Sequence, residues 1–167
     1  MRVVPLAVRP LTKEAFAPFG DVVTTDGAEL RLINNGSTER FHDLAKIDVT
    51  DGGGRAIVSL FRGQPFAPPV DIAMVERHPL GSQMFFPLGD RPYLAVVAPD
   101  ADGTPGAPLA FLCPPGIGVN YAKNTWHHPL LSLRAVSDFL VVDRDGPGNN
   151  LEEHFYAETQ FRIDALT

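Results

Sequence analysis

The stretch that decides the fold is PGIGVNYAKNTWHHPLL, residues 115–131. Its first half, Gly118–Tyr121, is β-prone, and its second half ends in the adjacent histidines His127 and His128. Asn124 lies between the halves, and Asn tolerates the left-handed conformation of a tight turn. The pattern predicts a strand, a turn and a second strand. Neighbours on a strand point to opposite faces, so at most one of the two histidines is expected to enter an interior pocket.

A similar segment lies upstream, MVERHPLGSQMFFPL, residues 74–88. Glu76 and His78 are two positions apart and therefore share one face of a strand. The residues Pro79–Ser82 are typical of a turn, after which Gln83 opens the return strand. The two segments together would place a carboxylate, imidazoles and an amide inside a small barrel. The alternative is that Glu76 forms a surface ion pair with Arg77 or a lysine, and that His78 bonds only to a backbone carbonyl.

The rest of the chain carries a similar pattern of short apolar runs between breakers. The 16 prolines and 15 glycines are dispersed and leave little room for long helices. Short helices are expected only at Thr12–Phe19 and Leu151–Glu158. Strands are expected at Ala56–Phe61, Asp71–Arg77, Gln83–Pro87, Tyr93–Ala98, Leu109–Cys113, Gly118–Tyr121 and Val136–Val142. Strands without alternating helices predict a mainly β fold, an antiparallel barrel or jelly roll whose mouth offers a pocket.

Length and charge exclude several classes of protein. A chain of 167 residues with no linker predicts one domain over residues 1–167. A net charge of −6 with scattered basic residues argues against nucleic-acid binding. No apolar run approaches the roughly 20 residues that span a bilayer, so no membrane association is expected. The only cysteine, Cys113, cannot form an intrachain disulfide, and we expect a cytoplasmic protein.

The two segments resemble the two metal-binding motifs of cupin barrels. The spacing of the second motif is kept from Gly116 to His127, with Asn124 in place of a glycine. In the first motif Glu76 stands where cupins have a histidine, and Gln83 stands where they have a glutamate. The motifs therefore leave a metal centre open without requiring one, because an amide oxygen is a poor ligand for a transition metal.

A more specific resemblance is to the ureidoglycolate lyase family of allantoin degradation. Four stretches between about residue 10 and residue 154 carry it, in order: INNG with ERFHDL (33–44), ERHPLG with Gln83 (76–83), GVNY with N-x-WHHPL (118–130), and DFL with DR (138–144). The resemblance implies a cupin-like antiparallel barrel with a few short helices, usually a homodimer. The implied reaction cleaves (S)-ureidoglycolate to glyoxylate and urea, an elimination that consumes no water.

This reaction needs one group to take the substrate's hydroxyl proton and another to protonate the departing urea nitrogen. We expect His78 and His127 to be base and acid, or ligands of a metal, with Glu76 orienting an imidazole. Arg40 and Lys123 are candidates to bind the substrate carboxylate. The urea group would be read by three polar side chains, Gln83, Asn34 and Tyr121. A divalent metal such as Ni²⁺, with candidate ligands His78, Gln83 and His127, stays open, and no organic cofactor is expected.

Two other functions compete with this hypothesis. A non-catalytic cupin-like protein would bind a small carboxylate without turnover. A metal-dependent cupin dioxygenase or isomerase would need a three-ligand metal centre. Away from the site, Asp138, Asp143 and Arg144 are expected to form a buried ion pair that braces the barrel, and Cys113 to be a packed small residue.

Overall fold

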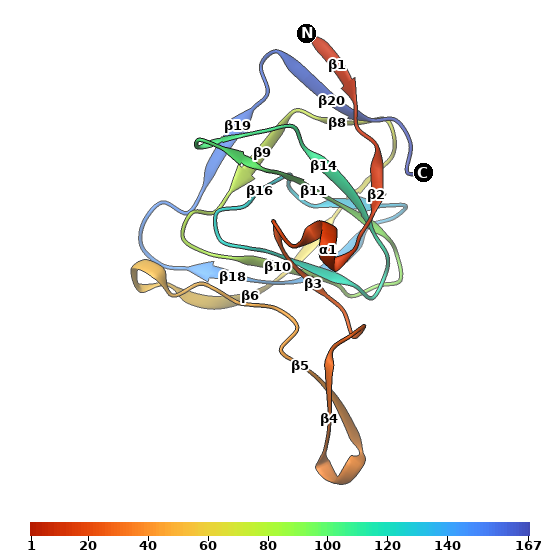
Figure 1. Cartoon of the computed structure of the whole chain (residues 1–167), viewed down its shortest axis with the longest axis vertical. Coiled ribbons are helices and arrows are strands. Elements are labelled where there is room, and N and C mark those ends of the chain that lie inside the picture. The colour runs from red at the N-terminus through yellow and green to blue at the C-terminus, as the bar shows by residue number, and fades with distance from the viewer.

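The computed structural model describes all 167 residues and is built almost entirely of strands (Figure 1). Its one α-helix, α1 (Lys13–Phe16), and the short 3-10 helices η1 (Asn34–Gly36) and η2 (Asp51–Gly53) lie between strands. The strands are β1 (Arg2–Pro5), β2 (Val8–Pro10), β3 (Gly20–Val23), β4 (Glu29–Ile33), β5 (Thr38–His42), β6 (Arg55–Gly63), β7 (Pro65–Phe66), β8 (Val70–Ile72), β9 (Met74–Arg77), β10 (Gln83–Pro87), β11 (Tyr93–Ala98), β12 (Asp100–Ala101), β13 (Thr104–Pro105), β14 (Leu109–Cys113), β15 (Gly118–Tyr121), β16 (Trp126–His127), β17 (Leu131–Leu133), β18 (Ser137–Asp145), β19 (Glu152–Phe155) and β20 (Thr159–Ile163).

Two larger sheets form the barrel. The first has the order β3-β15-β10-β18-β6, and the second has β19-β9-β16-β11-β14-β2, with β17 also paired to β11 and β7 paired to β17. A three-stranded sheet, β1-β20-β8, lies near the chain ends (Figure 1). Most pairs are antiparallel, whereas β1–β20, β2–β14 and β7–β17 are parallel. The predicted mainly β fold, built of mostly antiparallel strands with only short helices, is confirmed.

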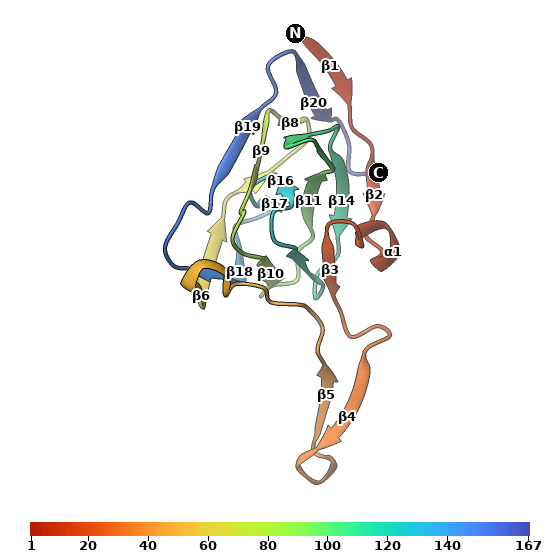
Figure 2. The same cartoon turned by 60° about the vertical axis from the view of Figure 1, so that its left-hand side comes forward.

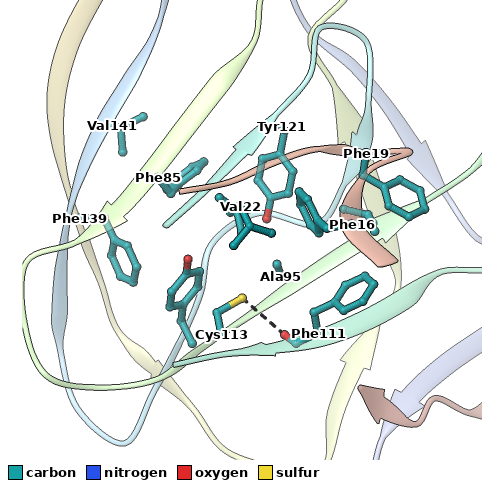
Figure 3. Packing of buried hydrophobic residues seen from close by; sticks show 13 residues of the cluster. Phe16, Phe19, Val22, Phe85, Ala95, Phe111, Cys113, Tyr121, Phe139 and Val141 are labelled. Atoms are coloured by element: carbon teal, nitrogen blue, oxygen red, sulfur yellow. Dashed lines mark hydrogen bonds between the residues drawn. The ribbon is translucent and has the colours of Figure 1, made fainter. Parts of the chain in front are cut away.

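The main core fills the space between the two larger sheets (Figure 3). Phe85 and Tyr121 come from the first sheet, Phe111 comes from the second, and Phe16 of α1 covers one side, with Phe16 in an edge-on contact with Phe111. Cys113 is fully buried in this cluster, and burial raises the pKa of its thiol to about 12, so the thiolate is absent at neutral pH. The expectation that Cys113 is a packed residue is confirmed.

A hairpin of β4, η1 and β5 projects from the barrel (Figures 1 and 2). We call residues 29–42 the arm. Its two strands pair only with each other, and every residue of β4 is exposed. At its tip Asn34, Asn35 and Gly36 all have positive φ, which Asn and Gly tolerate better than other residues. The arm follows β3 in the chain, and β3 is one edge of the first sheet.

Most predicted strands are confirmed, four of them with the predicted ends (β10, β11, β14 and β15). The helix near Thr12 is also confirmed, but is shorter than predicted; the Thr12 hydroxyl caps it by accepting a bond of 3.1 Å from the Ala15 amide. The predicted run Asp71–Arg77 is two strands, β8 and β9.

The predicted helix at Leu151–Glu158 is wrong. These residues contain β19, which pairs antiparallel with β9 and whose side chains alternate between half-buried and exposed. A tertiary partner of complementary register outweighs the weak local preference for helix. The structure contains no helix with the length and hydropathy needed to cross a bilayer.

The predicted ion pair among Asp138, Asp143 and Arg144 is also wrong. Arg144 is buried, but its guanidinium donates to the carbonyls of Asp51 and Pro147, at 2.8 Å each. Asp138 pairs instead with Arg62 on the adjacent strand β6, at 2.8 Å. Asp143 points to the opposite face of β18 from Arg144, whereas Asp138 shares the face of Arg144 but lies six residues away along the strand, opposite Arg62.

Candidate active site

Four polar side chains meet between the two larger sheets. Glu76 lies on β9, His78 directly follows it, Gln83 opens β10 and His127 ends β16. The turn of the downstream segment ties the two segments together, because the Asn124 amide donates to the His78 carbonyl at 2.9 Å. Asn124 has a φ of 67°, as expected for the residue that replaces glycine there. The two segments therefore converge as predicted.

A cavity of about 340 Å³ opens onto this cluster. It is lined by Phe61, Arg62, Gly63, Glu76, Gln83, Phe85, His127, Pro129 and Leu130. His127 lines the cavity and His128 does not, as the alternation along an extended segment requires. A volume of this size, with apolar walls and a few convergent polar groups, suits a small organic substrate.

Glu76 and His127 are direct partners across the β9–β16 pair. The Glu76 carboxylate oxygen Oε1 lies 3.7 Å from Nε2 of His127 and 4.0 Å from Nε2 of His78. Burial raises the pKa of the Glu76 carboxyl, and the charge of His78 opposes this rise. A carboxylate with a raised pKa, between two imidazoles, is suited to proton transfer near neutral pH.

The His127 ring is held in one orientation and one tautomer. Its Nδ1 lies 3.0 Å from the Thr125 carbonyl, which only accepts, so Nδ1 carries a proton. The ring stacks on Tyr121 with centroids 4.3 Å apart and planes 7° apart. Burial, with the nearby charge of His78, lowers the pKa of His127 to about 3. His127 is therefore neutral, and its buried Nε2 has a lone pair without a hydrogen-bond partner.

His78 has acceptors on both of its ring nitrogens. Nδ1 lies 2.8 Å from the Asn150 carbonyl, and Nε2 lies 3.2 Å from Oε1 of Gln83. The Gln83 amide nitrogen donates to Asp143 at 3.1 Å, which fixes its oxygen toward His78. Because both contacts of His78 are oxygen acceptors, this hydrogen-bonded chain is complete only when both nitrogens carry protons. The arrangement therefore fixes the His78 ring beside Glu76.

The same three residues could hold a metal ion. One ligand atom each from Glu76, His78 and His127 lies within 4.8 Å of the others. Both imidazoles have Nδ1 against a backbone carbonyl, which is the usual support for a metal-bound histidine, and the unpartnered Nε2 of His127 faces the cluster. The donor set fits a divalent transition metal. Binding would require His78 to release its Nε2 proton.

Comparison with known proteins identifies the family. A family model described as ureidoglycolate lyase matches residues 3–164. The chain belongs to the ureidoglycolate lyase family. It is 58% identical to "Ureidoglycolate lyase" of Brucella melitensis, across 98% of this chain and 97% of that one. It is 57% identical to "Ureidoglycolate lyase 1" of Rhizobium meliloti, across 92% and 90%. A 3,4-ketoisomerase from Helicobacter canadensis, 15% identical, overlaps 76% of this chain and 84% of its own at a TM-score of 0.41, too distant to bear on function.

The structure does not bring together every residue that the resemblance to ureidoglycolate lyases suggested for substrate binding. Gln83 lines the cavity, and Tyr121 is a buried wall behind His127. Lys123 lies outside the cavity, where its ammonium pairs with Asp51 at 2.6 Å and with Asp48 at 3.6 Å. Asn34 and Arg40 lie on the arm, which projects away from the barrel (Figure 2).

Sequence reasoning missed Arg62, which lines the cavity of this family member. Its guanidinium makes two bonds to Asp138, of 2.8 and 3.1 Å. The predicted strand Ala56–Phe61 stops one residue before it, and no motif or spacing marks Arg62 as a site residue. Its strand neighbour Phe61, whose ring packs edge-on against Phe85, also lines the cavity.

Proposed function

We propose that this protein is a ureidoglycolate lyase that cleaves (S)-ureidoglycolate to glyoxylate and urea. Family membership over nearly the whole chain is the observation that carries this proposal. The cluster of Glu76, His78 and His127 at a small-molecule cavity supports it, because the reaction requires both a proton acceptor and a proton donor. We further propose that the enzyme acts in the cytoplasm as a homodimer.

Ureidoglycolate has one carbon that carries a hydroxyl, a carboxylate, a hydrogen and a urea nitrogen. As the hydroxyl loses its proton, its oxygen forms a carbonyl and the carbon–nitrogen bond breaks. The bonding electrons leave on the nitrogen, which must be protonated to depart as urea. Each proton transfer by a positioned group contributes about 10²–10⁴-fold in rate.

We assign the base to Glu76 and the acid to His78. Glu76 lines the cavity, and burial raises its pKa, so its carboxylate is the stronger proton acceptor there. His127 is a weak base because its pKa is lowered to about 3, which argues against it as the base of the His78–His127 pair that the sequence left unassigned. His78 carries the proton that the urea nitrogen takes. Transfer of one proton from Glu76 to His78 through one bridging water, across the 4.0 Å between their atoms, restores both groups.

His127 completes the site as a neutral acceptor. Its unpartnered Nε2 faces the cavity side of the cluster, where it can accept a hydrogen bond from the substrate hydroxyl and orient it toward Glu76. Its stacking on Tyr121 and its bond to Thr125 prevent rotation of the ring. Gln83 was expected to read the urea group; we assign it instead the role of an acceptor that holds the His78 proton in place.

If a divalent ion such as Ni²⁺ occupies the site, Glu76, His78 and His127 would hold it. It would then act as a Lewis acid toward a substrate oxygen. Gln83, predicted as a ligand, would instead support His78. Metal-dependent and metal-free chemistry make different demands on the same residues, and they can be separated experimentally.

The test is turnover of racemic ureidoglycolate, with glyoxylate and urea both measured, before and after exhaustive chelation. Turnover that survives chelation supports direct acid–base elimination. Turnover lost on chelation and restored by one divalent ion supports the metal-bound form. Binding of ureidoglycolate without release of glyoxylate in either form would overturn the proposal and favour a non-catalytic binder of small carboxylates.

A further inference from the structure

The arm has two chemically different faces. Leu30 lies opposite Phe41 in the β4–β5 pairing, and Leu32 lies on the same face opposite Glu39; the side chains of Leu30, Phe41 and Leu32 are 51%, 37% and 65% exposed. Arg31 lies opposite Arg40 on the other face. These large apolar side chains are not covered by any other part of their own chain, and their contact with water is unfavourable. Exposed apolar residues of this kind are typical of an interaction surface.

Strand β6 has a matching pair of faces. It is the free edge of the first sheet, nine residues long. Val58 and Leu60 point to the outer face of the sheet and are 68% and 65% exposed. Phe61 and Gly63 line the cavity. A long unpaired edge with exposed apolar residues is a template for another strand, because its backbone groups lack partners.

The cavity lacks a free cation for the substrate carboxylate. The one cationic side chain in its lining, Arg62, is bound through two nitrogens to Asp138. Around the cluster lie the Glu76 carboxylate and Asp143, which has one buried oxygen without a partner. Binding of a negatively charged substrate beside these carboxylates requires a positively charged side chain that compensates the repulsion. Arg40 forms no ion pair or side-chain hydrogen bond within the chain, so its charge is available.

Edge-to-edge pairing of the arm with β6 of a second copy satisfies all of these features. The apolar face of the arm would continue the outer face of the sheet, beside Val58 and Leu60. The arginine face would then continue the inner face, toward the cavity mouth at Phe61–Gly63. The arm follows β3, at the edge of the sheet opposite β6, so its own β6 is remote, whereas a two-fold axis lets each copy offer its arm to the other.

We propose that the arm of one subunit pairs with strand β6 of a second copy and supplies Arg40 to that copy's active site as the carboxylate-binding residue. Each site is therefore shared between two chains. The identity of the anion rests on the proposed function, whereas the exchange of arms rests on the surfaces alone.

The sharpest test is a mixed dimer of an Arg40→Gln chain and a Glu76→Gln chain, isolated by two different affinity tags. The Arg40→Gln homodimer should show a KM raised about 10- to 100-fold, as expected for a lost charge-assisted bond. The mixed dimer should regain the wild-type KM at about half the wild-type rate, because one of its two sites has both residues intact. The proposal would be overturned if the mixed dimer shows the same raised KM as the Arg40→Gln homodimer, or if the Arg40→Gln homodimer has the KM of the wild type. Arg91→Gln, an exposed arginine outside the arm, is the control.

Oligomeric state tests the exchange of arms without reference to any substrate. Leu32→Glu and Leu60→Glu alter side chains that are exposed in the single chain, so each variant should fold, and each should halve the mass found by sedimentation. Phe155→Glu, which replaces an exposed apolar residue on β19, should leave the mass unchanged. The exchange of arms would be overturned if the wild-type protein sediments as a monomer, or if Leu32→Glu and Leu60→Glu both sediment with the mass of a dimer. Failure to turn over ureidoglycolate would overturn only the proposed function.

Discussion

The carboxylate of Glu76 lies 3.7 Å from Nε2 of the buried His127, on strands that pair these two residues directly. The distance is too long for a hydrogen bond and short enough for one substrate hydroxyl to contact both groups. The pairing register of β9 and β16 thus sets the reactive geometry, and a shift by one residue would turn one of the two side chains to the other face.

Replacement of Glu76 by Gln should lower kcat about 10²–10⁴-fold, because the amide keeps the shape of the side chain but cannot accept the hydroxyl proton. The measurement is steady-state glyoxylate release, with circular dichroism to verify the fold. Glu158→Gln changes an exposed carboxylate and serves as the matched control. Wild-type kcat in Glu76→Gln would remove Glu76 from the role of base.

Replacement of Gln83 by Leu should lower both activity and stability. The change removes the acceptor that holds the His78 proton and leaves Asp143 without its donor, which costs about 1–3 kcal/mol for a buried polar group. We expect a lower kcat with little change in KM, and a lower urea concentration at the midpoint of unfolding. A variant with reduced stability but unchanged kcat would show that Gln83 is purely structural.

In metal-free protein, acidification should destabilise the fold through His127. Its pKa is about 3 when folded and near the ordinary value of 6.5 when unfolded, so between these values only the unfolded chain binds the proton. Stability is fully present above pH 6.5 and declines as the pH falls toward 3, by about 2 kcal/mol at pH 5. Urea unfolding at pH 7.5 and 5 measures this loss. His127→Gln should show a smaller difference, and an equal difference would contradict the assignment.

Replacement of Arg144 by Lys should destabilise the protein by about 2 kcal/mol, because one ammonium cannot reproduce bonds to two backbone carbonyls in a buried position. Thermal and urea unfolding measure the effect. Arg55→Lys, at an exposed pair with Asp145 on the same two strands, should change stability by less than about 0.5 kcal/mol. Equal effects of the two substitutions would contradict the buried role of Arg144.

The strands that could be predicted are those with continuous β-branched and aromatic runs, such as Tyr93–Ala98. The missed ones are short and owe their conformation to distant partners. β16 has only two residues and β2 has three, and the latter pairs in parallel with β14, about a hundred residues away. The arm was missed although Leu30 and Leu32 alternate with Arg31, because its two strands are short and neither has a core-facing side.

The site was predictable where strand geometry alone determines it. Positions two apart share a face, which brought Glu76 and His78 together, and the similar turns of the two segments brought His127 beside them. Arg40 and Asn34 came from the family resemblance, which assigns residue types but not their places in space. The base and acid could not be separated from sequence, because burial and the acceptors around His78 decide which group carries a proton.

The pairing of the first strand with the last has a consequence for how the protein folds. β1 pairs with β20, β2 with β14 and β3 with β15, so the N-terminal segment has no sheet partner until most of the chain has been synthesised. Such long-range pairing predicts slow folding, on the order of milliseconds to seconds. While the N-terminal strands wait for their partners, the exposed apolar residues of the arm are open to aggregation or to chaperones.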